Sequence, residues 1–170
     1  MDIIKAFLII ISLSSGKYLN FVNKNSIPPE KRSFCKILYH QTNNCLYLFG
    51  GINQKQRFND LWAFYFSSAT WERIESSKEL QPSERQNPLF FKSIENNHTL
   101  YVFGGNDKHG SRADLWEFSL INFQWNFIEE FQDVGSRVYT GMTTGILENV
   151  QKIIIVGGKD LNYEYYDIFL

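Results

Sequence analysis

The amino-acid sequence predicts an all-β protein that is built from repeated units. An apolar run that ends in two glycines occurs three times, about every 50 residues. Short segments rich in aromatic and β-branched residues alternate with turn residues, and no 3.6-residue periodicity accompanies them. The three runs are LYLFGG at 46–51, LYVFGG at 100–105 and IIIVGG at 153–158. Such repetition is typical of folds in which small sheets stack on one another.

Each repeat contains four segments of strand length, named a to d in chain order. In the second repeat we expect strand a at 87–94, a turn at 96–97 and strand b at 100–103. Strand b is apolar at every position, which predicts that both of its faces are covered. Apolar and polar residues alternate over 116–120, so strand c should lie nearer the periphery. Strand d begins near Trp125 and becomes polar.

Four antiparallel strands in about 50 residues match one blade of a β-propeller. The chain holds about three such blades, whereas propellers typically close with four to eight. An open arc of blades would leave apolar faces in contact with water. We therefore expect either self-association of the blades or a chain that is a fragment of a longer protein.

Further repeated positions make the pattern specific. A Pro-x-x-Arg motif precedes strand a at 29–32 and 82–85, an aspartate and a tryptophan open strand c, and a second tryptophan follows nine residues later. Over residues 18–170 this combination resembles the kelch repeat, which implies a kelch-type, galactose oxidase-like β-propeller fold. The third unit departs from the pattern, because it lacks the proline and carries YEYYD before the strand c position. The motif positions are Gly50, Gly51, Asp60, Trp62, Trp71, Gly104, Gly105, Asp114, Trp116, Trp125, Gly157, Gly158 and Asp167.

Most of these motif residues have a structural interpretation. The glycines allow the backbone to leave strand b through conformations closed to other residues. The tryptophans are expected to pack between blades. The aspartates are expected to accept backbone hydrogen bonds from the preceding loop.

The repeats divide most of the chain into blades. Residues 18–26 align with strand d of a preceding blade, 27–80 form the first kelch repeat, 81–132 the second and 133–170 a truncated third. The remaining segment, 1–17, has two interpretations that the sequence leaves open.

The first interpretation of residues 1–17 is a secretory signal, because their apolar run fits such a signal and is shorter than the about 20 residues of a membrane-spanning helix. The second comes from the repeat. Aligning Tyr18 with Trp71 places Ile11 opposite Phe64, so the run would be a remnant strand c of a preceding blade. No transmembrane helix is expected under either interpretation.

The two interpretations predict different locations. A cleaved signal places the protein in the secretory pathway and makes Asn97, in Asn-His-Thr, an N-glycosylation acceptor. A strand makes the protein cytoplasmic. Cys35 and Cys45 lie at opposite ends of the predicted first hairpin, too far apart for a disulfide, so both are expected to be free thiols.

The chain offers little evidence of catalysis or nucleic-acid binding. Its 17 lysine and arginine residues balance 18 aspartate and glutamate residues, so no nucleic-acid partner is expected. His40, His98 and His109 fall in separate turns and loops without CxxC or HxxxH spacing, and we expect no metal and no cofactor. The chain is therefore predicted to be non-enzymatic. The alternative is a degenerate secreted propeller enzyme of the oxidase or lyase kind.

Binding of a partner protein is the predicted function. In a four-stranded meander the b–c and d–a loops emerge on one face, and these loops are rich in charged residues. Arginines at the d–a position have two interpretations: they tether loop carbonyls, or they converge on an acidic group. The kelch resemblance implies the second role, since arginines at this position in ubiquitin-ligase adaptors contact acidic peptides. The predicted partner is a protein or an acidic peptide, and its predicted contacts are Arg32, Arg57, Arg85, His109, Arg112, Arg137 and Tyr163.

Overall fold

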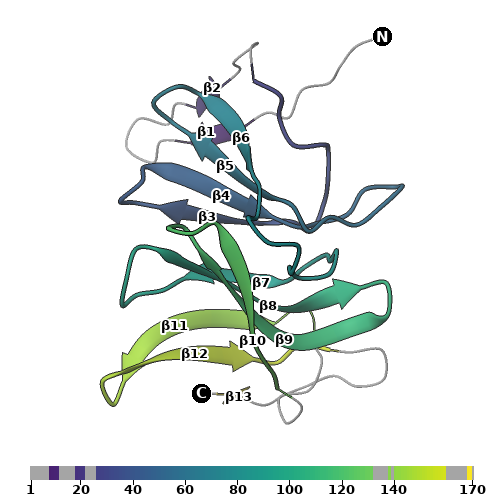
Figure 1. Ribbon diagram of the computed structural model, residues 1–170, viewed down its shortest axis with the longest axis vertical. Helices are drawn as coiled ribbons and strands as arrows, with labels where there is room; N and C mark the ends of the chain where they lie inside the picture. Colours follow the sequence, from purple (N-terminus) through teal and green to yellow (C-terminus); the bar gives the residue numbers. More distant parts are fainter. Residues whose placement is uncertain are drawn as a thin grey trace.

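The computed structural model shows an all-β chain, which confirms the predicted fold class (Figure 1). The residues that it describes are 8–11, 18–21, 26–131, 138, 140–159 and 168–169. Every regular element within these ranges is a β-strand. None of the described residues belongs to a helix suited by length and hydropathy to crossing a lipid bilayer.

Two complete four-stranded antiparallel sheets form the middle of the molecule, and we call them blade 1 and blade 2. Sequence neighbours pair in order in each, as the meander predicts. Blade 1 contains β3 (Lys36–His40), β4 (Cys45–Phe49), β5 (Leu61–Tyr65) and β6 (Thr70–Ile74). Blade 2 contains β7 (Leu89–Lys92), β8 (Thr99–Asp107), β9 (Gly110–Ser119) and β10 (Gln124–Glu130).

A third sheet, blade 3, stacks below blade 2 in Figure 1. It consists of β11 (Gly141–Leu147), β12 (Val150–Val156) and β13 (Ile168–Phe169), with β12 in the centre. The three stacked sheets are the arrangement of part of a propeller.

A two-stranded hairpin, β1 (Leu8–Ile11) and β2 (Tyr18–Phe21), precedes blade 1. Its register places Ile11 opposite Tyr18, as strands c and d of blade 1 place Phe64 opposite Trp71. Strands c and d of a preceding blade would have this register, and the assignment of the segment to such a blade stays a prediction. Residues 1–7 and 12–17, where a signal cleavage site is the alternative, lie outside the described residues.

The main hydrophobic core lies between blade 1 and blade 2. Trp125 of strand d is 2% exposed, and its ring centroid lies 5.3 Å from that of Phe49 in blade 1 and 4.9 Å from that of Phe118 in its own blade. Burial of such rings between sheets is the largest apolar contribution to packing that a single residue makes. Trp125 therefore joins the two blades.

The glycine pairs adopt the backbone conformation that their repetition indicates. In all three repeats the first glycine has φ between 60° and 67° and the second between 92° and 104°. A Cβ atom at Gly50 would lie 2.8 Å from the carbonyl oxygen of Arg85 in the next blade, and one at Gly51 would lie 2.8 Å from that of Ser33. Close approach of backbones and a positive φ both require glycine here.

The strands of blade 2 differ in length from those expected. Strand a is limited to β7, because Asn87 has a φ of 53° and leaves the extended conformation before the strand begins. Strands b and c are longer, since backbone pairing continues beyond the glycines to the pair formed by Asp107 and Gly110. The predicted b–c loop of this blade is therefore mostly a β-hairpin.

The two cysteines are free, and they lie at opposite ends of the first hairpin. Cys45 pairs with His40 near the turn, whereas Cys35 precedes Lys36, whose partner Phe49 is at the far end. Burial raises the pKa of both thiols. A thiol with a raised pKa is a poor nucleophile, so the structure gives neither cysteine a reactive character.

Candidate functional site

Arg85 connects the separate motif elements of blade 2. Its Nη1 and Nη2 atoms donate to the two carboxylate oxygens of Asp114 at 2.6 and 2.8 Å, and Nη1 also donates to the carbonyl of Gly104 at 3.0 Å. Trp116 Nε1 donates to the same carboxylate at 2.7 Å. The arginine of Pro-x-x-Arg, the glycine pair and the Asp-x-Trp motif thus form one hydrogen-bonded unit.

Blade 1 repeats this unit. Arg32 pairs with both carboxylate oxygens of Asp60 and donates from Nη1 to the carbonyl of Gly50 at 3.1 Å, while Trp62 Nε1 donates to Asp60 at 2.8 Å. The tethering interpretation of these arginines therefore describes their observed geometry. The aspartates differ from the expectation, because the main partners of their carboxylates are arginine and indole groups rather than loop amides.

The Arg85–Asp114 pair is buried, with 1% of the arginine side chain and 11% of the aspartate side chain exposed. Burial by itself raises the pKa of Asp114, but hydrogen bonds from Arg85 and Trp116 and the positive charge of Arg85 more than offset it, so the pKa lies below its ordinary value. The carboxylate is thus ionised and paired, and removal of either partner would leave an uncompensated buried charge.

The third repeat retains the backbone arrangement of this unit. In each repeat the residue after the arginine forms a β-bridge with the residue after the glycine pair. The bridges join Ser33 with Ile52, Gln86 with Asn106, and Val138 with Lys159. Arg137 and Asp167, the predicted partners in the third repeat, lie outside the described residues, as does Tyr163.

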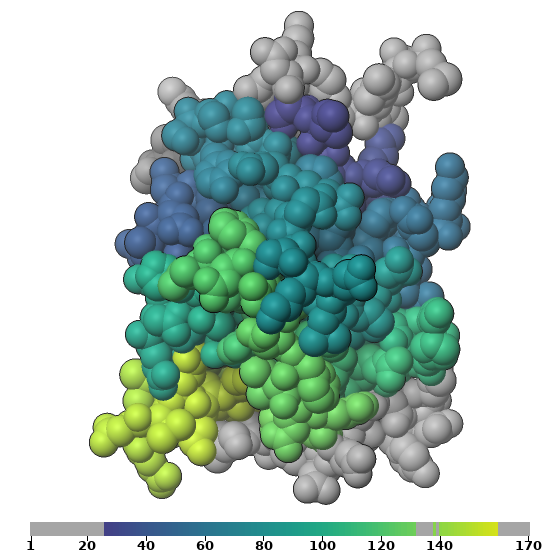
Figure 2. Space-filling view, in the orientation of Figure 1, coloured from purple at the N-terminus to yellow at the C-terminus, as the bar shows by residue number. Residues whose placement is uncertain are grey.

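A cavity of about 660 Å³ opens on the face of the b–c and d–a loops, between blade 1 and blade 2. The blade 1 loop at 53–58 and the β8–β9 hairpin project on the same side of the molecule, at the right of Figures 1 and 2. The cavity is lined by Lys55, Gln56, Arg57, Asn59, Gln81, Pro82, Ser83, Glu84, Asp107, Lys108, His109 and Arg112. Four basic side chains thus face two carboxylates. We call this the loop-face cavity.

Local hydrogen bonds order the blade 1 side of the loop-face cavity. The Oδ1 atom of Asn53 accepts hydrogen bonds from the backbone amides of Lys55 and Gln56 at 2.8 and 2.9 Å, which is the geometry of an Asx turn. Arg57 Nη2 donates to Asn106 Oδ1 of blade 2 at 3.3 Å, while its buried Nε atom has no hydrogen-bond partner among the described residues. Arg57 is therefore held to blade 2 by a single hydrogen bond from Nη2.

Asp107 organises the opposite side. Its carboxylate accepts hydrogen bonds from His109 N at 2.7 Å, Ser83 Oγ at 2.9 Å and Arg112 Nε at 2.6 Å. Burial raises the pKa of Asp107, but these three donors together outweigh burial and hold the pKa below its ordinary value. Because this ionised group is buried, Arg112 is held in place with 33% of its side chain exposed.

The structure separates the five predicted contact residues that it describes into two groups. Arg57, His109 and Arg112 line the loop-face cavity, whereas Arg32 and Arg85 are buried in the ion pairs of their own repeats. Ser83, which lies inside the Pro-x-x-Arg motif and donates to the Asp107 carboxylate, was not predicted as a site residue. Its position within a repeated motif was the one feature of the sequence that could have indicated it.

Metal ligands do not gather in the described part of the chain. No group of three or more histidine, cysteine, aspartate or glutamate side chains that could hold an ion is found there. His40 has other partners in place of a metal ion. Its Nδ1 atom accepts a hydrogen bond from Asn43 N, and its Nε2 atom lies 3.0 Å from the carbonyl oxygen of Asn97. Both ring nitrogens therefore serve the structure of neighbouring turns.

Comparison with known proteins identifies the class to which this fold and its repeated ion pairs belong. The family model of the KLHDC2/KLHL20/DRC7 Kelch-repeats domain matches residues 5–170. The chain therefore belongs to the kelch-repeat family. It is also similar to the dynein alpha chain of the flagellar outer arm from Chlamydomonas reinhardtii, with 25% identity over 161 residues. That alignment covers 89% of this chain and 3% of the dynein chain, so the similarity concerns a small segment of a much longer protein.

Proposed function

We propose that the chain is a non-enzymatic interaction module that binds an acidic segment of a partner protein in the loop-face cavity. The observation that carries the proposal is the cavity itself, which has basic side chains from two blades on loops ordered by internal hydrogen bonds. A pre-organised surface loses little conformational entropy on binding. Membership of the kelch family supports the general role, since kelch domains are commonly protein-interaction modules.

The charge of the cavity favours an acidic partner. Asp107 is already neutralised by Arg112, which leaves Glu84 as the remaining carboxylate against Lys55, Arg57 and Lys108. Guanidinium and ammonium groups at such a surface attract carboxylates and speed association with an acidic segment. Because Arg32 and Arg85 donate to groups within their own repeats, we propose for them a supporting role beneath the cavity rather than direct contact.

A peptide titration tests the proposal. A fluorescein-labelled decapeptide that contains four glutamates is titrated with the purified chain, and binding is followed by fluorescence anisotropy. Exchanging Lys55 and Lys108, both exposed, to glutamate should weaken binding about tenfold or more without loss of fold, because these changes reverse charge only at the surface. Higher salt should weaken binding of the unaltered chain.

The matched control is Lys78→Glu, which changes an exposed lysine of the β6–β7 loop that does not line the cavity. It should bind the peptide as the unaltered chain does. Equal binding of a peptide with glutamine in place of glutamate, or undiminished binding by the double variant, would contradict the proposal.

A second proposal concerns self-association of the blades. The face of blade 1 that points away from blade 2 exposes Ile37 and Tyr39, at 60% and 49%. Exposed apolar surface of this kind favours association through a stacked blade. Light scattering on the purified chain should show a dimer or larger assembly, and Ile37→Lys with Tyr39→Lys should shift it to the monomer. A monomer at every concentration would instead support the alternative that these 170 residues act as a segment of a larger kelch protein. The similarity to the dynein chain is compatible with this alternative, since it covers only 3% of that chain.

A further inference from the structure

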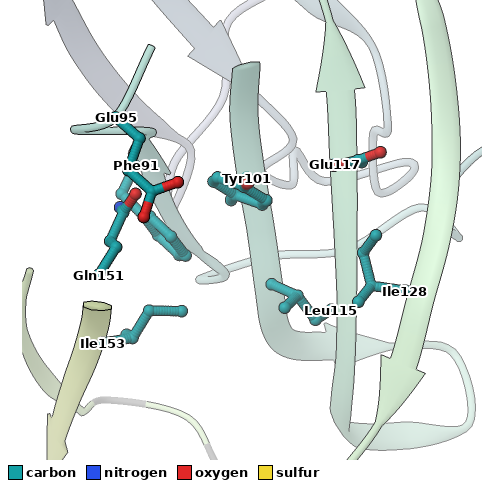
Figure 3. Close-up of a pocket in the computed structure, with 8 residues that line it drawn as sticks. All are labelled: Phe91, Glu95, Tyr101, Leu115, Glu117, Ile128, Gln151 and Ile153. Carbon is teal, nitrogen blue, oxygen red and sulfur yellow. The ribbon is translucent and has the colours of Figure 1, made fainter. Parts of the chain in front are cut away.

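A second pocket lies between blade 2 and blade 3 and shares no residue with the loop-face cavity. Its volume is about 290 Å³, below the usual range for pockets that hold drug-sized ligands and cofactors. Figure 3 shows the residues that line it, which come from all four strands of blade 2, from the β7–β8 turn and from β12 of blade 3. They are Phe91, Glu95, Tyr101, Leu115, Glu117, Ile128, Gln151 and Ile153.

The walls of this inter-blade pocket are aromatic and aliphatic. Phe91, Tyr101 and Glu117 are neighbours in one row across β7, β8 and β9. The rings of Phe91 and Tyr101 stack, with centroids 5.3 Å apart and planes inclined by 22°. Leu115 and Ile128 cover the lower part of the pocket in Figure 3. The pocket therefore offers a flat ring and an apolar surface to whatever enters it.

Two carboxylates lie at the rim of the same pocket. Glu117 accepts one hydrogen bond from Asn126 at 3.2 Å, and Glu95 is exposed in the β7–β8 turn. Neither forms an ion pair with another described residue. Burial raises the pKa of Tyr101, and the negative charges of Glu117 and Glu95 act in the same direction. The pocket is thus negative as well as apolar.

The interface between blade 1 and blade 2 shows why this composition is unusual. Ala63 is the blade 1 residue that corresponds to Glu117 of blade 2. Ala63 pairs with Tyr47 of strand b in blade 1, and Glu117 pairs with Tyr101 of strand b in blade 2. Ala63 is fully buried in the core that contains Phe118 of the next blade. An apolar cover of that kind over Glu117 would bury an unpaired charge, which is strongly unfavourable. A cationic group over Glu117 would instead pair with its charge.

We propose that the inter-blade pocket binds the side chain of an arginine from a partner protein. The planar guanidinium stacks on the ring of Tyr101 and donates to Glu117 and Glu95, while its aliphatic stem lies against Leu115 and Ile128. The small volume of the pocket accommodates one side chain. The proposal does not depend on the loop-face cavity, because the two sites share no residue and select groups of opposite charge.

Titration with Nα-acetyl-arginine N-methylamide, followed by methyl NMR of the full chain, tests this site. The methyl signals of Leu115, Ile128 and Ile153 should shift in a saturable manner. The neutral isostere Nα-acetyl-citrulline N-methylamide should leave them in place. Glu117→Gln should weaken binding of the arginine probe about tenfold, because it removes the negative charge of the group that accepts from the guanidinium.

Glu129→Gln is the matched control, since it makes the same charge change at an exposed position of β10 outside the pocket. Glu95→Gln, in an exposed turn, provides a second test that does not disturb a strand, and it should also weaken binding. Equal shifts with the citrulline probe, or undiminished binding by both pocket variants, would overturn the proposal. Equally tight binding of Nα-acetyl-lysine N-methylamide would overturn the assignment to arginine.

Discussion

Arg85 and Asp114, 29 positions apart in the chain, form a two-point ion pair in the interior of blade 2. The pair joins the segment before strand a to the start of strand c, and its counterpart Arg32–Asp60 does the same in blade 1. A guanidinium suits this position because its planar fork of donors matches the two oxygens of a carboxylate. The repeated sequence motif is therefore a repeated hydrogen-bonded cross-link.

Loss of one partner of this pair should destabilise the chain strongly. Asp114→Ala leaves Arg85 buried without its carboxylate, which costs about 3–5 kcal/mol in comparable buried pairs. Urea unfolding followed by tryptophan fluorescence measures the change in the free energy of unfolding. Arg73→Ala breaks the exposed pair with Glu75 and should cost less than about 1 kcal/mol. Similar losses in both variants would show that burial of the Arg85–Asp114 pair does not matter.

Stability should fall in acid because of the carboxylates with lowered pKa values. Asp107 and Asp114 have lower pKa values in the folded chain than in the unfolded chain, so their contribution is present above the unfolded value of 3.8 and is lost as the pH falls through the folded values. Urea unfolding between pH 6 and pH 2.5 should show this loss. Asp107→Asn should have a shallower dependence on pH in that window, and an unchanged slope would contradict the assignment.

His40 should add a second, milder dependence on pH. Burial lowers its pKa below the ordinary histidine value of 6.5, and the positive charges of Lys92 and His98 act in the same direction. The neutral ring is required, because Nδ1 accepts a hydrogen bond from Asn43 N. Its contribution to stability is therefore full above pH 6.5 and is lost as the pH falls toward the folded pKa. Thermal unfolding of His40→Gln should lack this component between pH 6.5 and 5, whereas His98→Gln, at an exposed position, should retain it.

The second glycine of each pair should tolerate no side chain. Gly51→Ala combines a φ of 102° with contacts at 2.8 and 2.9 Å to Ser33 O and Cys35 Cβ, so we expect a loss of about 2 kcal/mol or more. Gly110→Ala serves as the control, because it has a φ of 125° but no atom within 4 Å of the added Cβ. It should show the cost of backbone strain alone. Chemical denaturation of the two variants compares them, and equal losses would mean that crowding at Gly51 is negligible.

The stacked four-stranded sheets were predictable because the repeats carry the same signals in the same order. The apolar residues on both faces of strand b and the glycine pair after it are local features of the sequence. Such features can be recognised without knowledge of the tertiary structure. The extension of β8 and β9 to Asp107 and Gly110 was not predictable, since backbone pairing beyond the glycines depends on hydrogen bonds between strands. Residues 106 and 107 read as loop residues on composition alone.

Part of the candidate site followed from topology. The meander places Arg57, His109 and Arg112 on one face, and these residues line the loop-face cavity. The pairing of Arg85 with Asp114 could not be read from the sequence, because repetition shows that both positions matter without showing that they meet. The inter-blade pocket was equally inaccessible, since Glu117 looks like an ordinary polar residue of an alternating strand until blade 3 is stacked beside it.

The backbone of Arg85 belongs to two blades at once. While its side chain holds Asp114 in blade 2, its amide donates to Phe58 O and its carbonyl accepts from Gly51 N, both at 2.9 Å and both in the repeat of blade 1. Blade 1 therefore cannot separate from blade 2 without exposing these amides, and blade 2 cannot lose its internal ion pair without loosening blade 1. Slow hydrogen exchange at Gly51 and Arg85 would consequently report on one cooperative unit of two repeats rather than on either repeat alone.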